Sequence, residues 1–266
     1  MEYNKIIKAK KSLGQNFLKS KSVLNRIILE GEVSKKDTIL EIGPGKGALT
    51  EKLLECAESI IAIEKDRELV EFLKEKFNGE IKSGKLILIE GDCLEFKLDK
   101  KIKSYKLIAN IPYNITGAIL KKFLSESIQP ERMVLLVQKE VCDRIIARSQ
   151  KESILSISVK AYGIPKYIMK VDKKLFNPSP KVDSAILSIK NISKKNFEMV
   201  DEKKFFEILK LGFSHKRKVL ISNLSKLSDK TRLEKIFKDL NINIKTRAEN
   251  ISTAVWLALI QKMSEK

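Results

Sequence analysis

The chain has 266 residues, 43% of them hydrophobic, which is enough for one large core or for a large and a small one. Its 53 Lys and Arg residues outnumber its 34 Asp and Glu residues, and the net charge of +19 indicates a polyanionic partner, either nucleic acid or an anionic membrane surface. No window approaches ~18 consecutive apolar residues, and no apolar stretch follows the basic N-terminus, so we expect neither a membrane span nor a signal peptide.

The cysteines and the single histidine limit the possible chemistry. Cys56, Cys93 and Cys142 show no CxxC or CxH spacing, so we expect separate reduced thiols, a cytoplasmic location and no metal site. His215 is the only histidine, which excludes a Ser-His-Asp triad and a multi-histidine metal centre.

Strand-like and helix-like patterns alternate through the first part of the chain. After a lysine-rich N-terminal arm, apolar residues at helical spacing predict a helix that begins after Ser20 or Ser22. Strands are then expected over 38–42, 59–64, 86–89, 106–109 and 132–138, and helices over 48–56, 66–77, 116–124 and 139–148. This alternation predicts parallel βαβ units in a doubly wound α/β sheet.

Beyond residue 165 the pattern changes. Two strand-like runs, 166–171 and 183–189, have no helix between them, so we expect an antiparallel ribbon at the edge of the sheet. A Lys/Asn/Ser-rich linker follows, and residues 201–266 carry apolar residues at helical spacing. We therefore expect a first domain over 1–190, including the basic arm, and a small all-α domain over 191–266. No long apolar seam demands a dimer, so we expect a monomer.

A glycine-rich loop joins the first expected strand to its helix. The glycines of residues 43–47 let the backbone approach a ligand with no Cβ in the way, at a helix N-terminus that favours polar groups. Glu64 ends the second strand, where a carboxylate can bind both hydroxyls of a ribose. Asp92 follows the third strand and is placed to meet the amine of an adenine ring. Together these residues predict a site for a nucleoside ligand.

The strand expected over 106–109 ends in the unusual tetrapeptide Asn110-Ile111-Pro112-Tyr113. The Asn110 side-chain oxygen and the Ile111 carbonyl can accept hydrogen bonds from an exocyclic amine, Pro112 fixes φ near −65°, and Tyr113 offers a flat face for stacking. Hydrogen-bond acceptors that bind the hydrogens of the amine help to localise its lone pair on the nitrogen, as a methyl transfer to adenine N6 requires. A plain strand-to-turn junction also uses Asn and Pro. The interpretation of this tetrapeptide as a base-binding site therefore depends on the nucleoside site that is predicted beside it.

This combination resembles the class I S-adenosylmethionine-dependent methyltransferases, specifically the ribosomal RNA adenine N6-dimethyltransferase family of the small-subunit type. The resemblance covers essentially the whole chain, and the matching motifs are residues 13–18, 41–47, 64, 90–92, 110–115, 138–140 and 176–184. It implies a Rossmann-like sheet, S-adenosylmethionine as cofactor with S-adenosylhomocysteine as product, and dimethylation of two adjacent adenines in a loop near the 3′ end of 16S rRNA during ribosome biogenesis.

The resemblance also assigns roles to individual residues. For the cofactor, it implies that Asn16 and Leu18, with Gln15, close over it, that Gly43 and Gly45 approach its methionine part, that Glu64 holds its ribose, that Asp92 contacts its adenine and that Asn110 links the two sites. We expect the target adenine to leave its stack, to be held by Asn110, Ile111 and Pro112, and to lie between the rings of Tyr113 and Phe176.

The partner implied is 16S rRNA in the immature small ribosomal subunit. Basic residues of the arm (Lys5, Lys8, Lys10, Lys11, Lys19 and Lys21) and of the C-terminal domain (Lys216, Arg217 and Lys218) are candidates for phosphate contacts. We assign His215 no acid or base role and expect it at the surface of the RNA-facing segment.

Four alternatives remain open. Macrolide-resistance methylases of the large subunit share most of the motifs. Gly14 and residues 180–185, 213–218 and 223–224 favour the small-subunit type. The small-subunit family often has Leu in place of Ile111, which the resistance methylases also have, and usually Gln or Asn in place of His215. The chain could act mainly as an RNA-binding subunit assembly factor, which weak turnover with tight binding would indicate. A DNA adenine methylase fits the charge but not residues 15–17. A nicotinamide dehydrogenase leaves residues 110–113 unexplained.

Overall fold

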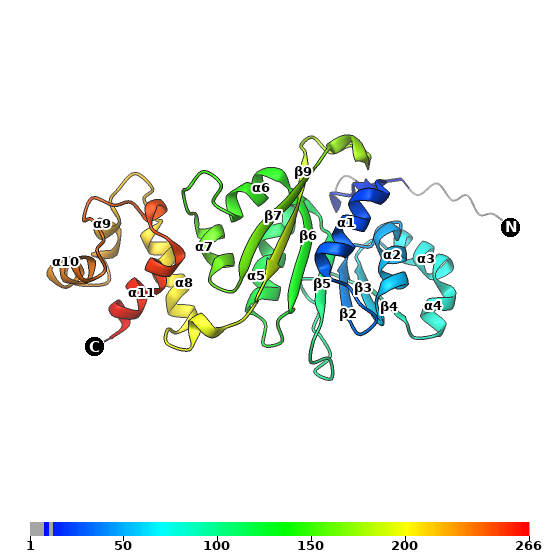
Figure 1. Cartoon of the computed structure of the whole chain (residues 1–266), viewed down its shortest axis with the longest axis horizontal. Coiled ribbons are helices and arrows are strands. Elements are labelled where there is room, and N and C mark those ends of the chain that lie inside the picture. The colour runs from blue at the N-terminus through cyan, green and yellow to red at the C-terminus, as the bar shows by residue number, and fades with distance from the viewer. Residues whose placement is uncertain (1–7, 11–12, 266) are drawn as a thin grey trace. The chain divides into compact units, whose positions relative to one another are not determined.

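The structure is a computed structural model that describes residues 8–10 and 13–265. A seven-stranded sheet with the order β4-β3-β2-β5-β6-β9-β7 forms its centre (Figure 1). The strands are β2 (Thr38–Ile42), β3 (Ser59–Glu64), β4 (Leu86–Glu90), β5 (Lys106–Asn110), β6 (Arg132–Gln138), β7 (Ile164–Val171) and β9 (Ser184–Lys190). β2 to β6 are parallel, β9 runs antiparallel to β6, and β7 lies at the edge beside β9. The expected doubly wound sheet with an edge ribbon is confirmed.

Helices follow the parallel strands as the alternation predicted. They are α1 (Lys21–Gly31), α2 (Ala48–Cys56), α3 (Arg67–Lys76), α4 (Asn78–Lys82), α5 (Thr116–Ser125) and α6 (Lys139–Ile145). The Ser20 hydroxyl accepts from the Val23 N–H and caps α1, and the Asp66 carboxylate accepts from the Glu68 N–H and caps α3. Residues 133–137 of β6 are fully buried, as expected of a central strand that is covered on both faces.

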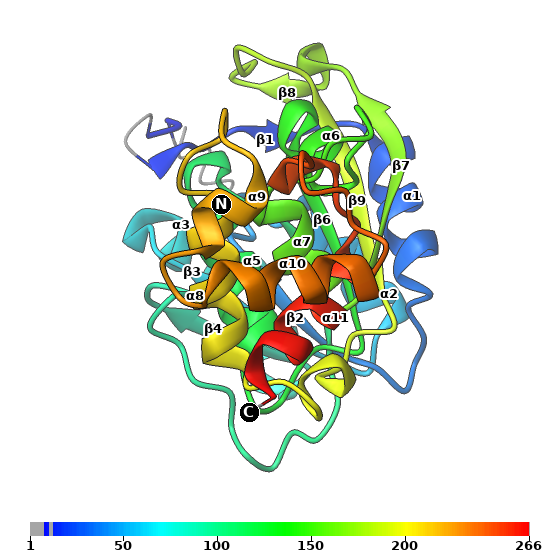
Figure 2. The same ribbon diagram turned by 90° about the vertical axis from the view of Figure 1, so that its left-hand side faces the viewer.

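The arm contributes a strand that the sequence patterns did not indicate. β1 (Phe17–Leu18) pairs antiparallel with β8 (Phe176–Asn177), which lies in the connection between β7 and β9 (Figure 2). Two-residue strands are too short to show an alternating pattern, so neither could be predicted. The pairing brings the arm next to the motif that begins at Phe176.

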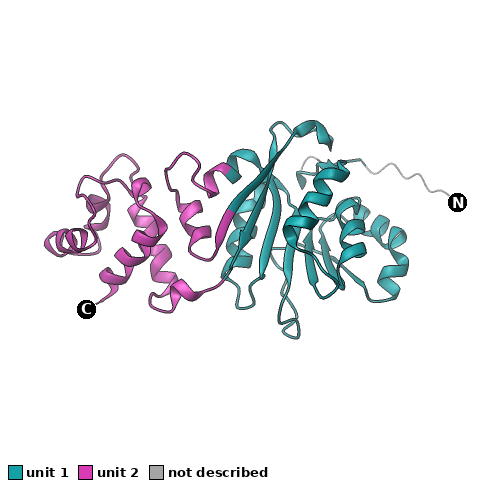
Figure 3. Ribbon diagram, in the orientation of Figure 1, with its two compact units in different colours: residues 1–142, 166–192 teal, residues 143–165, 193–266 magenta. Residues whose placement is uncertain are grey.

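The chain divides into two compact units (Figure 3). The first comprises residues 1–142 and 166–192 and contains the sheet, and the second comprises residues 143–165 and 193–266. The second unit contains α7 (Ile154–Lys160), α8 (Glu202–Gly212), α9 (Leu220–Leu224), α10 (Lys230–Asp239) and α11 (Thr253–Ser264), and Phe205, Phe237 and Trp256 are fully buried in its core. We did not expect α7, whose residues belong to the second unit.

None of the helices in the described part of the chain is long and apolar enough to cross a membrane. Among the same residues, no three His, Cys, Asp or Glu side chains form a group that could hold a metal ion.

Candidate functional site

A cavity of about 380 Å³ lies at the carboxyl ends of the parallel strands. The strand order reverses between β2 and β5, since the chain continues from β2 to β3 and β4 on one side and from β5 to β6 on the other. Such a switch point is where open α/β sheets bind ligands. The cavity is lined by these site residues expected from the sequence: Gln15, Asn16, Leu18, Gly43, Gly45, Glu64, Asp92, Asn110, Ile111, Pro112 and Tyr113.

The glycine loop after β2 has backbone angles that suit glycine. Gly43 and Gly45 have φ of +64° and +60°, in the left-handed region. A Cβ on Gly45 would lie 3.0 Å from the Phe17 ring of the arm. Gly47 serves packing instead, because a Cβ there would lie 2.5 Å from the buried Phe77 ring. Gly43 and Gly45 line the cavity, whereas Gly47 does not.

Glu64 ends β3 with its side chain in a ring of backbone donors. Its Oε2 accepts from the Gly45 N–H at 3.1 Å, and its Oε1 accepts from the N–H groups of Lys65 and Asp66, both at 2.9 Å. Burial raises the pKa of the Glu64 carboxyl, against the opposing effect of these donors. The three bonds fix the carboxylate and leave acceptor capacity for a hydroxyl donor.

Asp92 follows β4 on a neighbouring wall. Its Oδ1 accepts from the Leu94 N–H at 2.8 Å, and its Oδ2 is 2.8 Å from the Lys65 ammonium. The Lys65 ammonium holds the pKa of Asp92 below its usual range, so this carboxylate is an acceptor. Lys65, which also lines the cavity, therefore joins the ribose and adenine ends of the expected nucleoside site.

Glu41 in β2 is a lining residue that the sequence interpretation missed. Its side chain is only 1% exposed, and its Oε2 has no hydrogen-bond partner among the described residues. Burial raises the pKa of its carboxyl to about 8, and the neighbouring Glu64 adds to the rise. An unpartnered buried carboxyl favours a cationic or donor group in the cavity. The signal for it was an acidic residue inside an apolar strand.

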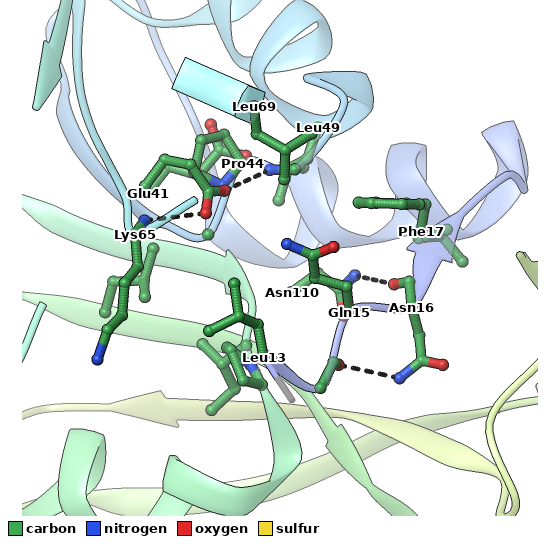
Figure 4. A pocket seen from close by; sticks show the side chains of 18 of the residues that line it. Leu13, Gln15, Asn16, Phe17, Glu41, Pro44, Leu49, Lys65, Leu69 and Asn110 are labelled. Atoms are coloured by element: carbon green, nitrogen blue, oxygen red, sulfur yellow. Dashed lines mark hydrogen bonds between the residues drawn. The ribbon is translucent and has the colours of Figure 1, made fainter. Parts of the chain in front are cut away.

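Asn110 is oriented by the arm. Its Nδ2 donates to the Asn16 carbonyl at 3.1 Å, and the Asn16 Nδ2 donates to the Gly14 carbonyl at 3.0 Å (Figure 4). A carbonyl can only accept, so these bonds determine which end of each amide is the nitrogen. In the part of the chain that the structure describes, the Asn110 Oδ1 is therefore left as a free acceptor. Pro112 has φ −59°, close to the value expected of a proline.

Tyr113 and Phe176, the expected pair of stacking faces, lie in different environments in this structure. The Tyr113 side chain lines the cavity, and its hydroxyl lies 2.5 Å from the Ser184 Oγ at the start of β9. Burial raises the pKa of Tyr113, so the phenol stays protonated. Phe176 is only 3% exposed and packs in the hydrophobic core, because its position opposite Leu18 turns the ring inward. Phe176 does not line the cavity, and its stacking on the target base stays a prediction.

The arm is attached to the cavity wall by Asp66. The Lys10 Nζ lies 2.7 Å from one Asp66 oxygen, and the Gln15 Nε2 donates to the other at 2.8 Å. The Lys10 N–H also donates to the Gln15 Oε1 at 2.7 Å. The Lys10 ammonium, which we expected to bind RNA phosphate, is thus occupied within the chain. Two further arm lysines that we expected to contact phosphate, Lys5 and Lys11, lie outside the described residues.

The basic segment of the second unit is fully exposed. Lys216, Arg217 and Lys218 are exposed in the loop between α8 and α9, as is His215, whose Nδ1 is 3.0 Å from the Ser214 hydroxyl. Asn223, only 2% exposed, holds this loop: its Nδ2 donates to the carbonyls of Gly212 at 2.6 Å and His215 at 3.3 Å. Local hydrogen bonds thus hold the loop, and its three cationic side chains face solvent.

Comparisons with known proteins agree with this geometry. A family model described as ribosomal RNA adenine dimethylase matches residues 6–265. Proteins named ribosomal RNA small subunit methyltransferase A are 39% identical in Mycoplasmopsis pulmonis, over 97% of this chain and 100% of that protein, and 37% identical in Nostoc sp., over 96% and 97%.

Solved structures agree in fold. A dimethyladenosine transferase from Plasmodium falciparum has a TM-score of 0.77 at 27% identity, covering 91% of this chain and 95% of that chain. The 23S rRNA methyltransferase ErmE has a TM-score of 0.76 at 23% identity, covering 94% and 100%, which is a likeness of fold. With a family match across nearly its whole length, the chain belongs to the ribosomal RNA adenine dimethylase family.

Proposed function

We propose that the protein transfers methyl groups from S-adenosylmethionine to N6 of two adjacent adenines near the 3′ end of small-subunit rRNA, giving N6,N6-dimethyladenines in the cytoplasm during ribosome biogenesis. The observation that carries the proposal is the orientation of Asn110. Its donor end is bound to the Asn16 carbonyl, so its acceptor end is available to an amine beside the glycine loop.

The residues of the cavity fit the cofactor. The unpartnered Glu41 carboxyl suits a cationic group, the glycine loop accommodates a closely approaching ligand, Glu64 retains acceptor capacity for ribose hydroxyls, and Asp92 is an ionised acceptor for an adenine amine. Gln15, Asn16 and Leu18 of the arm cover the site. When bound, S-adenosylmethionine supplies an activated methyl group on a sulfonium, so the protein needs to position the acceptor more than to deprotonate it.

The target adenine is held by the tetrapeptide at the end of β5. The Asn110 Oδ1 and the Ile111 carbonyl accept from its amine, and Tyr113 stacks on one face of the ring. The bond from Tyr113 to Ser184 fixes the tilt of that ring, and the protonated phenol takes no part in proton transfer. We retain Phe176 as the expected aromatic partner of the second face.

Small-subunit rRNA is the substrate that the comparisons favour. The full-length relatives at 37% to 39% identity are named for the small subunit, whereas the large-subunit enzyme is a 23% match in fold. We retain the expectation of a monomer and of Lys216, Arg217 and Lys218 as phosphate contacts.

Transfer of labelled methyl groups tests the proposal. Purified protein and labelled S-adenosylmethionine are mixed either with small subunits that lack the modification or with large-subunit RNA. We expect label in two adjacent adenines near the 3′ end of the small-subunit RNA. Label confined to large-subunit RNA overturns the assignment, and binding without label in either supports the assembly-factor alternative.

The variant Asn110→Ala separates chemistry from cofactor binding. It removes the acceptor for the amine, so we expect transfer to fall by at least two orders of magnitude while S-adenosylhomocysteine still binds measurably in calorimetry. Ile119→Val, at a fully buried position on the following helix, controls for local packing. Full activity of Asn110→Ala contradicts the proposed grip on the base.

A further inference from the structure

The connection between β7 and β9 places lysines at the rim of the cavity. Residues 173–181 contain Lys173, Lys174 and Lys181 and no acidic residue, and all three side chains are exposed. Lys19, on the arm just after β1, is exposed as well. We call these four residues the rim lysines. None of the ammonium groups of Lys19, Lys174 and Lys181 has a carboxylate within 4 Å in the described part of the chain.

Backbone hydrogen bonds hold the rim lysines beside the cavity. Phe17 pairs with Asn177 in the β1–β8 ladder, and the Lys19 N–H donates to the Leu175 carbonyl at 2.9 Å. Lys19 and Asn177 both line the cavity (Figure 2 shows β1 beside β8). The two segments that carry the rim lysines are therefore joined to each other and to the wall of the site.

The connection is also braced from within. The Ser179 hydroxyl donates to the Lys173 carbonyl at 2.9 Å, and the Lys173 ammonium donates to the Lys181 carbonyl at 3.5 Å. Pro178 and Pro180 restrict the backbone between them. A segment that is already ordered loses less entropy when it binds a ligand.

The nearby acids neutralise only part of this charge. Asp183 interacts with Lys173 and also with Lys170, whose Nζ lies 2.9 Å from its Oδ2, and Asp172 accepts from the Lys174 N–H at 2.8 Å. Lysines held close together without acidic partners repel one another, and a polyanion relieves that repulsion.

Ser184 connects the base pocket to the segment that carries three of the rim lysines. Ser184, the first residue of β9 after the connection, is bonded to the Tyr113 hydroxyl at 2.5 Å. A base that stacks on Tyr113 leaves its sugar and the two adjoining phosphates at the mouth of the cavity, where Lys19 and Asn177 lie. We infer that the rim lysines bind the RNA phosphates that flank the target adenine. The inference rests on the proposed function and adds the contact that holds the flipped nucleotide.

The test compares two neutralised pairs. Lys174→Gln with Lys181→Gln removes two rim charges. Lys100→Gln with Lys101→Gln removes two exposed charges from the loop before β5, at the end of the sheet opposite Asn110. The probe is the small ribosomal subunit that lacks the modification. For the rim pair we expect affinity to fall on the order of tenfold and the slope of log K against log salt to decrease by about 1.4, for two contacts to single-stranded RNA. The control pair should match the wild type.

Hydroxyl-radical footprinting locates the lost contact. For the rim pair we expect protection of the RNA backbone to disappear at the nucleotides next to the target adenines and to persist elsewhere. Melting temperature and S-adenosylhomocysteine affinity should not change, which excludes misfolding as the cause.

The outcomes separate this inference from the proposed function. If the wild-type protein places no label in small-subunit RNA, both fail. If the wild type labels the RNA and the rim pair behaves as the control pair does, or loses protection at a distance from the adenines, the inference about the rim lysines is wrong and the proposed function stands.

Discussion

At the scale of single residues, Glu41 gives the protein a pH dependence that follows from its burial. Its folded-state pKa of about 8 lies above the usual value near 4.5, so the folded protein binds the proton more tightly than the unfolded chain does. The free energy of unfolding contributed by this group is therefore fully present below about pH 4.5 and is lost as pH rises toward 8, at up to about 1.4 kcal/mol per pH unit.

The variant Glu41→Gln removes this titration. We expect its melting temperature, relative to wild type and without cofactor, to rise steadily between pH 6 and pH 8. The exposed Glu58→Gln is the matched control and should track the wild type. The measurement is thermal unfolding at several pH values. A difference between Glu41→Gln and wild type that does not change with pH contradicts the assigned pKa.

The same residues show what a sequence reveals about a site. Gly43, Glu64, Asp92 and Asn110 end or follow parallel strands, so their meeting at one edge of the sheet could be predicted. Glu41 lies inside a strand, and the sequence does not show whether its carboxylate faces the cavity or the opposite side of the sheet. The burial of Phe176 could not be predicted, because a two-residue strand does not reveal which face its side chains take.

At the scale of elements, the arm is the part of the site held most indirectly. Its residues cover the cavity, yet Asp66 and Lys10, which hold it through contacts with each other and with Gln15, do not line the cavity. Asp66 also caps α3 and donates its N–H to Glu64. One residue, through its side chain and its backbone N–H, thus connects the arm, a helix start and the carboxylate that we assign to the ribose.

Loosening this attachment should shorten the time that the cofactor stays bound. Asp66→Asn retains a capping oxygen but loses the ion pair, and Lys10→Met loses the same pair from the other side. We expect each to weaken S-adenosylhomocysteine binding roughly fivefold through faster dissociation, since a charge-assisted bond is lost. The double variant should bind S-adenosylhomocysteine no more weakly than either single variant does. Stopped-flow dissociation measures this, and additive effects show that the two residues act separately.

Elements were predictable where their patterns were long. The strands of the sheet follow from their period, and helices such as α1 and α3 follow from period and caps. β1, β8 and the seven-residue α7 were missed because so few residues show no periodicity. The attachment of the arm depends on contacts between residues some 50 positions apart, which no local pattern indicates.

At the scale of the whole molecule, the net charge of +19 is distributed over both units, but the ionic partners of its lysines differ. Lys10 and Lys65 are paired with Asp66 and Asp92, whereas Lys216, Arg217 and Lys218 are exposed. Exposed cations contribute to RNA affinity through the release of counterions, and paired ones contribute less because their charge is already compensated.

We therefore expect the exposed cations of the second unit to contribute to RNA binding and not to cofactor binding. Replacing Lys216, Arg217 and Lys218 together by Gln should lower the salt slope of small-subunit binding by about 2 and weaken affinity at physiological salt, since each lost phosphate contact removes roughly 0.7 to 0.9 of slope. S-adenosylhomocysteine binding should not change, because the cavity is built by the first unit alone. Filter binding across a salt series measures the slope. A slope equal to that of wild type shows that the basic segment does not contact RNA, and its charge then serves only solubility.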